Sequence, residues 1–411
     1  MEDIRARCCV AGGGPAGMML AFLLARAGVD VVVLEKHADF LRDFRGDTVH
    51  PSTLEIMHEL GLLDVFLERP HQELRRIIGQ IGDTRIVIGE FTGLRLTCPF
   101  IALMPQWDFL NFLAEQARRY PAFRLLMRAE VTDLIEENGT VAGVRATTLD
   151  GPLEVRADLV VGCDGRHSTV RERAGLEVRD LGAPIDVLWM RISKRPEDGA
   201  PVLGRFDAGR LLVTLDRGDY WQCAYVIRKG GFEELKTHDV QVLRDDIAAI
   251  APFLRERVGE IRSWDDVKLL TVTVDRLKTW YRPGLICIGD AAHAMSPIGG
   301  VGINLAIQDA VATANILAAR LAARTVRIED LHAVQKRRTF PVAVTQAGQV
   351  FVQERIFVRV LGSTRKFRAP WPLKLLNRFP FLRRFPARFV GVGVRPEHVR
   401  TPEAGVSSRS A

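Results

Sequence analysis

The sequence predicts an α/β fold in which a Rossmann-like domain is interrupted by a separate β-sheet and followed by a helical C-terminal segment. Three observations support this prediction. A strand, a glycine-rich turn, a helix and a second strand follow one another at the start of the chain. Short strand-like runs lie between two later glycine-containing segments. The residues after position 360 are basic and rich in phenylalanine.

Length and composition set the first limits. A chain of 411 residues is too long for one simple core, so we expect two domains, and 47% hydrophobic residues indicate a folded protein. The six cysteines form no CxxC pair, and four of them lie in apolar runs. This pattern favours reduced thiols in a cytoplasmic protein over disulfides or a metal site. The N-terminus does not resemble a signal peptide, and no run reaches the length of a membrane span.

Charge is distributed unevenly. The net charge is +7, but the residues from Leu361 onward contain eleven Lys or Arg and two Glu, which leaves the remainder near −2. The basic character therefore belongs to the C-terminal segment. A protein that binds nucleic acid through its folded body would carry the basic patch there, so this class is disfavoured.

The N-terminal residues predict a βαβ unit. Residues 7–11 form an apolar run that ends in glycines and predicts a buried strand. Residues 15–27 predict a helix that Gly28 terminates, and residues 29–34 predict a second strand ending at Glu35.

The remaining elements follow from periodicity and turn signals. Helices are predicted over 51–67, 105–119 and 303–323. Hairpins are predicted within 123–163, with turns at Asn138-Gly139 and Asp150-Gly151. Strands of a separate sheet are predicted over 185–192, 202–216 and 220–228.

The first chemical motif is Gly12-x-Gly14-x-x-Gly17. In such a turn the first glycine permits the tight bend, the second admits a phosphate and the third lets the helix pack against the strand. The helix N-terminus then presents free N–H groups to a pyrophosphate. Glu35, at the end of the next strand, is placed to accept ribose hydroxyls. The alternative is a glycine turn without a ligand.

A late segment adds a second part of a dinucleotide site. Asp290 follows the apolar run 285–288, so its carboxylate is suited to a polyol hydroxyl. Pro297 and a glycine-rich stretch then lead into a helix near Ile303. The positive end of that helix favours an anion, and a reduced flavin ring is anionic. The alternative is an ordinary loop before a helix.

A middle segment, Asp164-Gly165-Arg166, follows the apolar run 159–161. Alone it is as consistent with a structural turn as with a cofactor contact. The three segments in this order resemble the FAD-dependent aromatic hydroxylases, the para-hydroxybenzoate hydroxylase family of single-component monooxygenases. The resemblance runs from about Arg7 to about Thr345.

The resemblance implies a discontinuous Rossmann-like FAD-binding domain with an inserted β-sheet substrate domain. We expect the FAD-binding domain to comprise 1–75, 98–178 and 275–345. The substrate domain would comprise 76–97 and 179–274, and 346–411 would form the C-terminal helical segment.

The resemblance also assigns cofactor contacts by position. The assigned residues are Gly12, Gly14, Pro15, Ala16, Gly17, Glu35, Lys36, Arg45, Gln106, Val131, Asp164, Asp290, Pro297, Gly300, Val301, Gly302, Ile303 and Asn304. In the family, the positions of Arg45 and Gln106 contact FAD, and the position of Asp164 is linked to both FAD and NAD(P)H. Val131 would contact the adenine. The stretch 45–52 and the residues of the second sheet do not match para-hydroxybenzoate hydroxylase itself, so its substrate is not carried over.

The implied activity is hydroxylation of an aromatic or polycyclic, lipophilic small molecule. FAD would be bound, NAD(P)H would be a transient co-substrate, and O₂ would react through a flavin C4a-hydroperoxide. No catalytic residue is assigned, because the flavin carries the oxygen chemistry. His50 and His293 fall near the proposed flavin, but a structural role is expected more often than proton transfer.

The substrate pocket is predicted between Pro297 and the second sheet. Candidate residues on the sheet are Trp189, Arg191, Phe206, Gln222 and Ala224. Which face points inward is open, because a one-residue slip reverses it.

Two groups of alternatives stay open. One is another flavin reaction on the same fold: epoxidation, Baeyer–Villiger oxidation or alkene reduction. A halogenase is disfavoured because its WxWxIP signature is absent. The other is a flavin-binding protein without enzymatic activity. For the C-terminal segment, packing on the body competes with peripheral contact to an anionic membrane. The sequence makes no prediction of oligomeric state.

Overall fold

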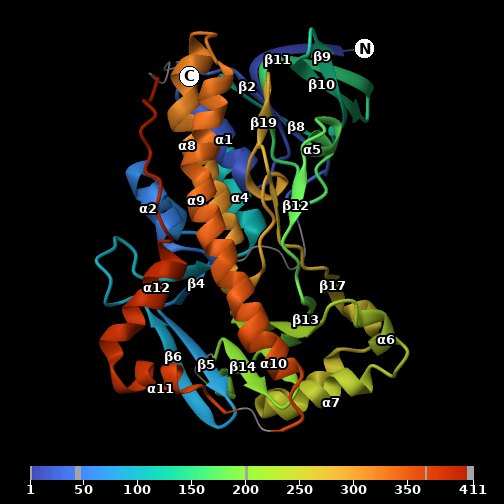
Figure 1. Ribbon diagram of the computed structural model, residues 1–411, viewed down its shortest axis with the longest axis vertical. Helices are drawn as coiled ribbons and strands as arrows, with labels where there is room; N and C mark the ends of the chain where they lie inside the picture. Colours follow the sequence, from blue (N-terminus) through green and yellow to red (C-terminus); the bar gives the residue numbers. More distant parts are fainter. Residues whose placement is uncertain (1, 42–47, 200–201, 366–367, 405–411) are drawn as a thin grey trace.

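The computed structural model describes residues 2–41, 48–199, 202–365 and 368–404, and it confirms the predicted α/β fold. Two lobes, each built on its own large sheet, lie one above the other along the longest axis (Figure 1). The helix α9 (Ile328–Val352) runs along both lobes.

The first lobe is centred on a largely parallel sheet. Its strand order is β19-β20-β11-β1-β2-β8, with the β9–β10 hairpin paired to β11. The strands are β1 (Glu2–Ala11), β2 (Val31–Glu35), β8 (Phe123–Met127), β9 (Glu130–Glu137), β10 (Thr140–Thr148), β11 (Gly151–Gly162), β19 (Tyr281–Arg282) and β20 (Leu285–Cys287). Cys8, Cys9 and Val10 are fully buried because β1 is central and covered on both faces.

The helices of this lobe pack on the sheet and on one another. The helix α1 (Pro15–Arg26) contacts both α4 (Gln106–Ala117) and α8 (Gly302–Ala322), and α9 packs on α8. The segment Ile298–Ala322 is long and apolar enough to span a membrane, but 78% of its apolar window is buried. Packing within the lobe therefore accounts for its composition.

Turn chemistry explains where several elements end. The predicted turn at Asn138-Gly139 is confirmed, since both residues have positive φ, 50° and 76°. The predicted single helix over 51–67 is wrong. It divides into α2 (Pro51–Glu59) and α3 (Leu63–Leu67), because Gly61 takes a φ of 68° between them.

The second lobe holds a mixed sheet of order β17-β13-β16-β15-β14-β5-β6. Its strands are β5 (Arg76–Ile81), β6 (Thr84–Glu90), β13 (Ile185–Ser193), β14 (Gly204–Asp207), β15 (Arg210–Asp216), β16 (Tyr220–Arg228) and β17 (Lys268–Leu270). The predicted single strand over 202–216 is wrong, because Ala208 and Gly209, with φ of 37° and 81°, turn it into the β14–β15 hairpin.

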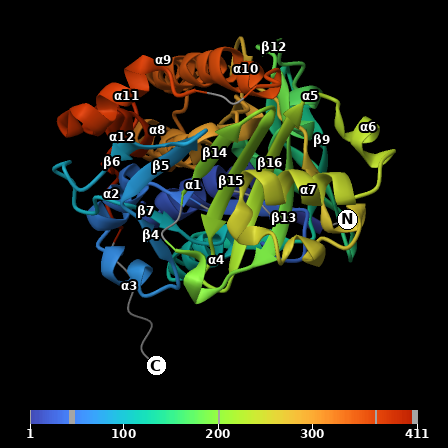
Figure 2. The same cartoon turned by 90° about the horizontal axis from the view of Figure 1, so that it is seen from below.

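One face of this sheet is covered by the helix α7 (Gln241–Ile250), which lies across the strands in Figure 2. Leu188, Met190 and Cys223 pack under it. Smaller elements complete the fold. They are β3 (Thr48–Val49), β4 (Gln72–Leu74) and β7 (Ile101–Leu103) in one sheet, β12 (Val178–Asp180) and β18 (Asp275–Leu277) in another, and the helices α5 (Thr169–Arg173) and α6 (Phe232–Lys236).

The C-terminal segment is helical and then extended. After α9 come a π-turn (Gln353–Phe357) and the helices α10 (Val358–Leu361), α11 (Trp371–Arg378) and α12 (Arg384–Gly391). Residues 394–404 then return along the first lobe, where the red trace in Figure 1 leads from α12 back toward α8. We call residues 394–404 the C-terminal strap.

Candidate functional site

The three predicted segments meet at the carboxyl ends of the neighbouring parallel strands β1, β11 and β20. A Cβ on Gly12 would lie 2.4 Å from the Cys163 carbonyl oxygen, and one on Gly289 would lie 3.0 Å from the Cβ of Ala16. Arg166 donates from Nε to Oδ2 of Asp290 over 3.2 Å. Segments that are far apart in the sequence therefore form one surface at this sheet edge.

The three glycines of the loop have different roles: two are required for packing within the protein, and one leaves space for a ligand. Gly12 has a φ of 103°, and a Cβ on Gly17 would lie 2.0 Å from the Gly12 carbonyl oxygen, so both are required by the protein's own packing. A Cβ on Gly14 would meet nothing within 4 Å. The open space lies at the start of α1, where Pro15 is the first residue, and this is where a phosphate group would fit.

Glu35 lies directly beside this loop. Its carboxylate accepts hydrogen bonds from the backbone N–H groups of Gly13 (2.8 Å) and His37 (3.0 Å), and only 8% of the residue is exposed. Lys36 is exposed after the strand. Ala129 donates to the Glu35 carbonyl oxygen, which brings Val131 at the start of β9 to the same end of the sheet. Lys36 and Val131 thus lie at the same end of the sheet as Glu35.

The carboxylate of Asp164 forms hydrogen bonds within its own segment. It accepts from Ser168 Oγ (2.5 Å) and from the Val170 N–H (3.0 Å), which fixes the start of α5. Burial raises its pKa even though these hydrogen bonds oppose the shift. The structure therefore gives Asp164 a structural role, while Arg166 provides the direct link to Asp290.

The late segment forms two turns before α8. Asp290 lies in the turn Gly289–Ala291 with a third of its side chain exposed. Pro297 and Gly300 flank a second turn and are half-buried. Gly300 is confined because a Cβ there would lie 2.3 Å from Thr48 Oγ1. The helix α8 begins at Gly302, one residue before the predicted start, so its N-terminal N–H groups lie beside this turn.

The remaining predicted residues differ in what they contact. Asn304 is 3% exposed, and its side chain accepts from the His50 N–H (2.9 Å) and donates to the Thr48 carbonyl (3.2 Å). Its amide therefore anchors the loop before α2. Gln106 is half-buried at the start of α4. Val301 is buried and Ile303 is half-buried in the first turn of α8. Arg45 lies outside the described residues.

His50 is fully buried at the start of α2. Its Nδ1–H donates to the carbonyl of Val390 in α12 over 2.8 Å, and its Nε2 has no partner among the described residues. Burial lowers the pKa of His50 to about 4, so the ring is neutral at physiological pH. The C-terminal helix α12 thus reaches the start of α2, a contact that nothing in the local sequence indicates.

His293 is equally buried but belongs to a charged cluster. Its Nε2 donates to Oδ2 of Asp309 over 2.5 Å, and Arg338 donates to Oδ1 of the same carboxylate over 2.8 Å. Burial opposes ionisation of Asp309, but His293 and Arg338 outweigh it and lower the pKa. The structural expectation for His293 therefore fits its contacts. Sequence reasoning missed Asp309 and Arg338, whose only signal was a charge inside an apolar helical pattern.

The second sheet turns one face toward the late segment. Trp189, Phe206 and Ala224 pack in an apolar cluster with Ile298, the residue after Pro297. Pairing of Trp189 with Ala224, and of Arg191 with Gln222, places these four on the same face. The inward face that the sequence left open is therefore the one carrying all five candidates.

Two of these candidates are already paired. Arg191 is exposed, lies 3.3 Å from Asp219 and stacks over the Tyr220 ring at 3.9 Å. Gln222 is buried and accepts from Arg217 Nε over 2.9 Å. They line the polar end of the face, whereas Trp189, Phe206 and Ala224 form its apolar part.

Comparisons with known proteins agree with this arrangement. The family described as "FAD binding domain" matches residues 5–347. The chain is 33% identical over 380 residues to a 6-methylpretetramide 4-monooxygenase of Streptomyces rimosus, covering 91% of this chain and 90% of that protein. It is 31% identical to a rifampicin monooxygenase of Streptomyces venezuelae over 73% of this chain, but spans only 61% of that protein.

Solved structures show the same fold. The p-nitrophenol 4-monooxygenase PnpA of Pseudomonas putida superposes with a TM-score of 0.73 at 20% identity, covering 95% of this chain and 98% of that one. PqsL of Pseudomonas aeruginosa superposes with a TM-score of 0.73 at 22% identity, covering 87% and 97%. With the glycine loop, the Asp290 turn and the family match in one site, the chain belongs to the FAD-dependent aromatic monooxygenases that share this FAD-binding domain.

Proposed function

We propose that this enzyme uses NAD(P)H and O₂ to hydroxylate an aromatic or polycyclic, lipophilic small molecule. The observation that carries the proposal is the apolar cluster that Ile298, at the proposed flavin, shares with Trp189 and Phe206 of the second sheet. An aromatic substrate held between them would lie against the reacting edge of the cofactor.

The residues of this chain would bind the cofactor and orient it. The open space at Gly14 would take the pyrophosphate, and Glu35 would accept hydroxyls of the ribose. Asp290 would accept hydroxyls of the ribityl chain, and the N-terminus of α8 would stabilise negative charge on the ring. When bound, FAD would supply reduction by NAD(P)H and activation of O₂. The apolar face of the second sheet would exclude water.

The proposed binding mode assigns a separate role to each lobe. Residues 1–75, 98–178 and 275–345 would form the FAD-binding domain, and residues 76–97 and 179–274 the substrate domain. The name of the relative with 33% identity refers to 6-methylpretetramide, which supports a polycyclic aromatic substrate. Epoxidation, Baeyer–Villiger oxidation and alkene reduction are the competing reactions on the same site.

The test is a substrate screen under ¹⁸O₂ with NADH and with NADPH. Polycyclic aromatic compounds should accelerate flavin reduction and yield product carrying one ¹⁸O per NAD(P)H consumed. Insertion of oxygen into a ring carbon–carbon bond, or product lacking ¹⁸O, would identify one of the competing reactions. If no compound allows NAD(P)H to reduce the bound flavin, the proposal fails.

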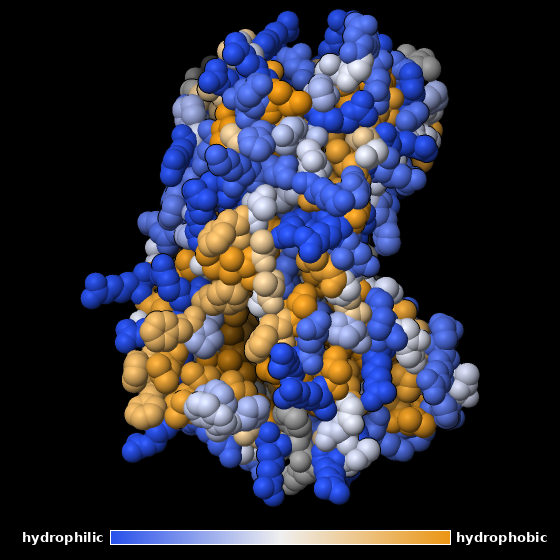
Figure 3. All heavy atoms as spheres, in the orientation of Figure 1, coloured by the Kyte–Doolittle hydropathy of each residue, from blue (hydrophilic) through white to orange (hydrophobic). Residues whose placement is uncertain are grey.

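We also propose that the face of α11 and α12 contacts an anionic membrane from which a lipophilic substrate enters. Trp371, Phe381 and Phe385 are 73%, 55% and 61% exposed. Figure 3 shows the resulting apolar region at its lower left, beside a hollowed part of the surface. Arg384 stacks on Phe381 and Phe385, and the surrounding segment is strongly basic. Like charge disfavours a second copy of this face as the partner.

Vesicle co-sedimentation tests this contact. The enzyme should bind vesicles of phosphatidylglycerol but not of phosphatidylcholine, and Phe381→Asp with Phe385→Asp should abolish binding. Leu149→Asp, which changes an apolar residue that is 73% exposed on the other lobe, is the matched control. Equal sedimentation of the double variant and the control would refute membrane contact through α11 and α12.

A further inference from the structure

A buried chain of charges connects the C-terminal strap to the Asp290 turn. Glu397, in the strap, is 6% exposed and accepts from Arg338 over 3.1 Å. Arg338 is fully buried in α9 and donates to Oδ1 of Asp309 in α8. Oδ2 of Asp309 accepts from the backbone N–H of Gly289 over 3.1 Å. Gly289 precedes Asp290, so this series of buried charged contacts ends at the proposed cofactor contact.

Charge balance explains why Glu397 is needed. Asp309 and Arg338 are both fully buried, and an unpaired guanidinium NH group at that depth costs free energy. Arg337 also donates to Glu397, over 2.7 Å, so two guanidiniums face two carboxylates. Without Glu397 the cluster would carry an excess positive charge. Arg338 would then be drawn further onto Asp309, which is the group that holds Gly289.

The turn beside Asp290 leaves little room for adjustment. Gly289 has a φ of 61°, and a Cβ there would lie 3.0 Å from Ala16 and 3.3 Å from Ala306. The turn is therefore wedged between the starts of α1 and α8, where the glycine loop and the cofactor ring would lie. A shift of Asp309 is transmitted to Asp290 through one backbone hydrogen bond.

From this geometry we infer that Glu397 is a positioning residue for cofactor binding, acting through Arg338 and Asp309 on the Gly289–Asp290 turn. The inference rests on the proposed role of Asp290 toward FAD. It also makes the strap part of the cofactor site. The two effects are thermodynamically linked. Bound FAD should therefore stabilise the docked strap by the same factor by which the docked strap increases the affinity for FAD.

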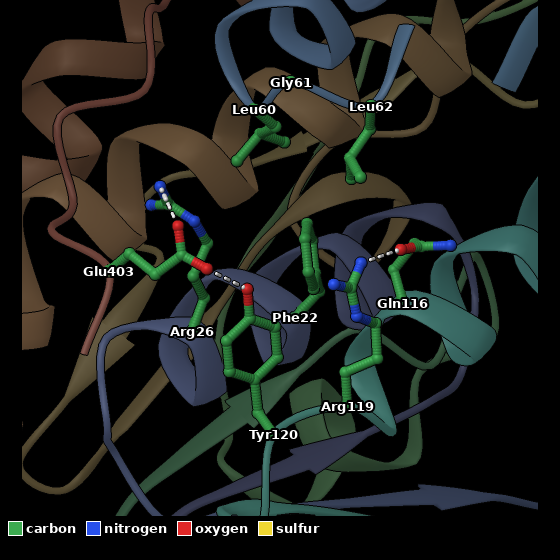
Figure 4. Close-up of a pocket in the computed structure, with 9 residues that line it drawn as sticks. All are labelled: Phe22, Arg26, Leu60, Gly61, Leu62, Gln116, Arg119, Tyr120 and Glu403. Carbon is green, nitrogen blue, oxygen red and sulfur yellow. Dashed lines mark hydrogen bonds and ion pairs between the residues drawn. The ribbon is translucent and has the colours of Figure 1, made fainter. Parts of the chain in front are cut away.

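The strap provides its own control. Glu403 accepts from Tyr120 Oη over 2.7 Å and pairs with Arg26 over 3.4 Å. These contacts border a cavity of about 190 Å³ that is also lined by Phe22 and Leu60 (Figure 4). Arg26 ends α1, about 18 Å along the helix from the glycine loop. Glu403 therefore fastens the same strap without reaching the cofactor turn.

The experiment compares Glu397→Gln with Glu403→Gln in the full chain. Dissociation constants for FAD are measured by quenching of flavin fluorescence, and hydrogen exchange of residues 394–404 is measured with and without FAD. Glu397→Gln should weaken FAD binding about tenfold, and Glu403→Gln less than twofold. Glu397→Asp should recover part of the affinity. FAD should slow exchange of the strap in the wild type and in Glu403→Gln, but not in Glu397→Gln.

A double variant covers the case in which Glu397→Gln does not fold. Arg338→Met with Glu397→Leu removes both partners of the buried pair, which generally costs far less stability than removing one. This variant should fold yet bind FAD about tenfold more weakly, because Asp309 loses its hydrogen bond from Arg338. Equal FAD affinity in all folded variants would overturn the inference. Failure of the wild type to bind FAD would instead overturn the proposed function.

Discussion

At the scale of single residues, the three glycines of the dinucleotide turn have different reasons to be glycine. Gly12 and Gly17 are fixed by contacts within the protein, whereas the space at Gly14 is open. Sequence alone predicted this turn because its pattern is local: one strand end, one helix start and the chain between them. The contact of Gly12 with Cys163, in a distant segment, could not be predicted in this way.

Gly14→Val should separate cofactor binding from folding. A Cβ at this position has no heavy atom within 4 Å outside the adjacent residues, so the free energy of unfolding of the apoprotein should change by less than about 0.5 kcal/mol, while the protein should purify colourless. Gly17→Val should instead lower the free energy of unfolding by about 3 kcal/mol, because of the close Gly12 carbonyl. Flavin absorbance and urea denaturation measure both effects. Yellow, fully loaded Gly14→Val protein would contradict the assignment.

His50 should make stability depend on pH. Its pKa is about 4 in the fold and near 6.5 when unfolded, so the unfolded chain binds more protons between those values. Stability is therefore lost as the pH falls through this window, by about 2 kcal/mol at pH 5. His50→Asn keeps a donor for the Val390 carbonyl but cannot titrate. Urea denaturation at pH 7.5 and pH 5 should show a drop smaller by about 2 kcal/mol in the variant; an equal drop would contradict this.

The charges around Asp309 show where sequence reasoning stops at this scale. Asp309, Arg338 and Glu397 are far apart in the chain, and each alone resembles a surface residue in a helix or loop. Their burial depends on α8, α9 and the strap coming together. No local sequence pattern indicates that these three elements come together. A single sequence therefore cannot reveal residue pairs that form only when they do.

At the scale of elements, the alternation of side chains along β13 and β16 shows which face of the second sheet packs against the late segment. Residues on one face join Ile298, and residues on the other join α7. The sequence predicted the strands but not their orientation, because both faces are apolar and the period of two is equally satisfied by either. It also missed the β14–β15 turn, where Ala208 takes a positive φ that this residue type rarely adopts.

Neighbouring residues of β16 allow this orientation to be tested. Ala224→Val adds bulk on the inner face, and Cys223→Val adds bulk on the face under α7. Both should lower the free energy of unfolding by about 1–2 kcal/mol, because the sheet is packed on both sides. Only Ala224→Val should change the KM for an aromatic substrate, by about threefold or more, with FAD content unchanged. A KM shift in Cys223→Val alone would place the pocket on the other face.

At the scale of the whole molecule, the two lobes are closely connected. The chain passes between the two sheets before β5, after β6, before β13 and after β17, and α9 extends about 37 Å along both. From α9, Gln349 donates to the carbonyls of Ser296 and Ile298, over 2.9 Å in each case. The sequence predicted two domains but could not show that one helix would run along both of them.

We therefore expect the two lobes to unfold together. Trp221 is buried in the second sheet and Trp280 in the first lobe, so each reports on one of them. With 5-fluorotryptophan incorporated, their ¹⁹F resonances should disappear at the same urea concentration. Gln349→Leu should lower both midpoints equally, because it releases the loop that joins the lobes. Two separate midpoints in the wild type would show that the lobes are independent.

The buried partnership of Arg338 with Glu397 also has a consequence for synthesis on the ribosome. Strand β1 and the glycine loop emerge first, but Glu397, the second carboxylate of the buried cluster, is made almost sixty residues after Arg338. Until then, Asp309 is the carboxylate that pairs with Arg338, and the α8–α9 pair carries the excess positive charge of Arg337. A nascent chain stalled before the strap should therefore be a poor acceptor of flavin even though every predicted cofactor residue has been made. Loading of the cofactor would thus follow synthesis of the strap.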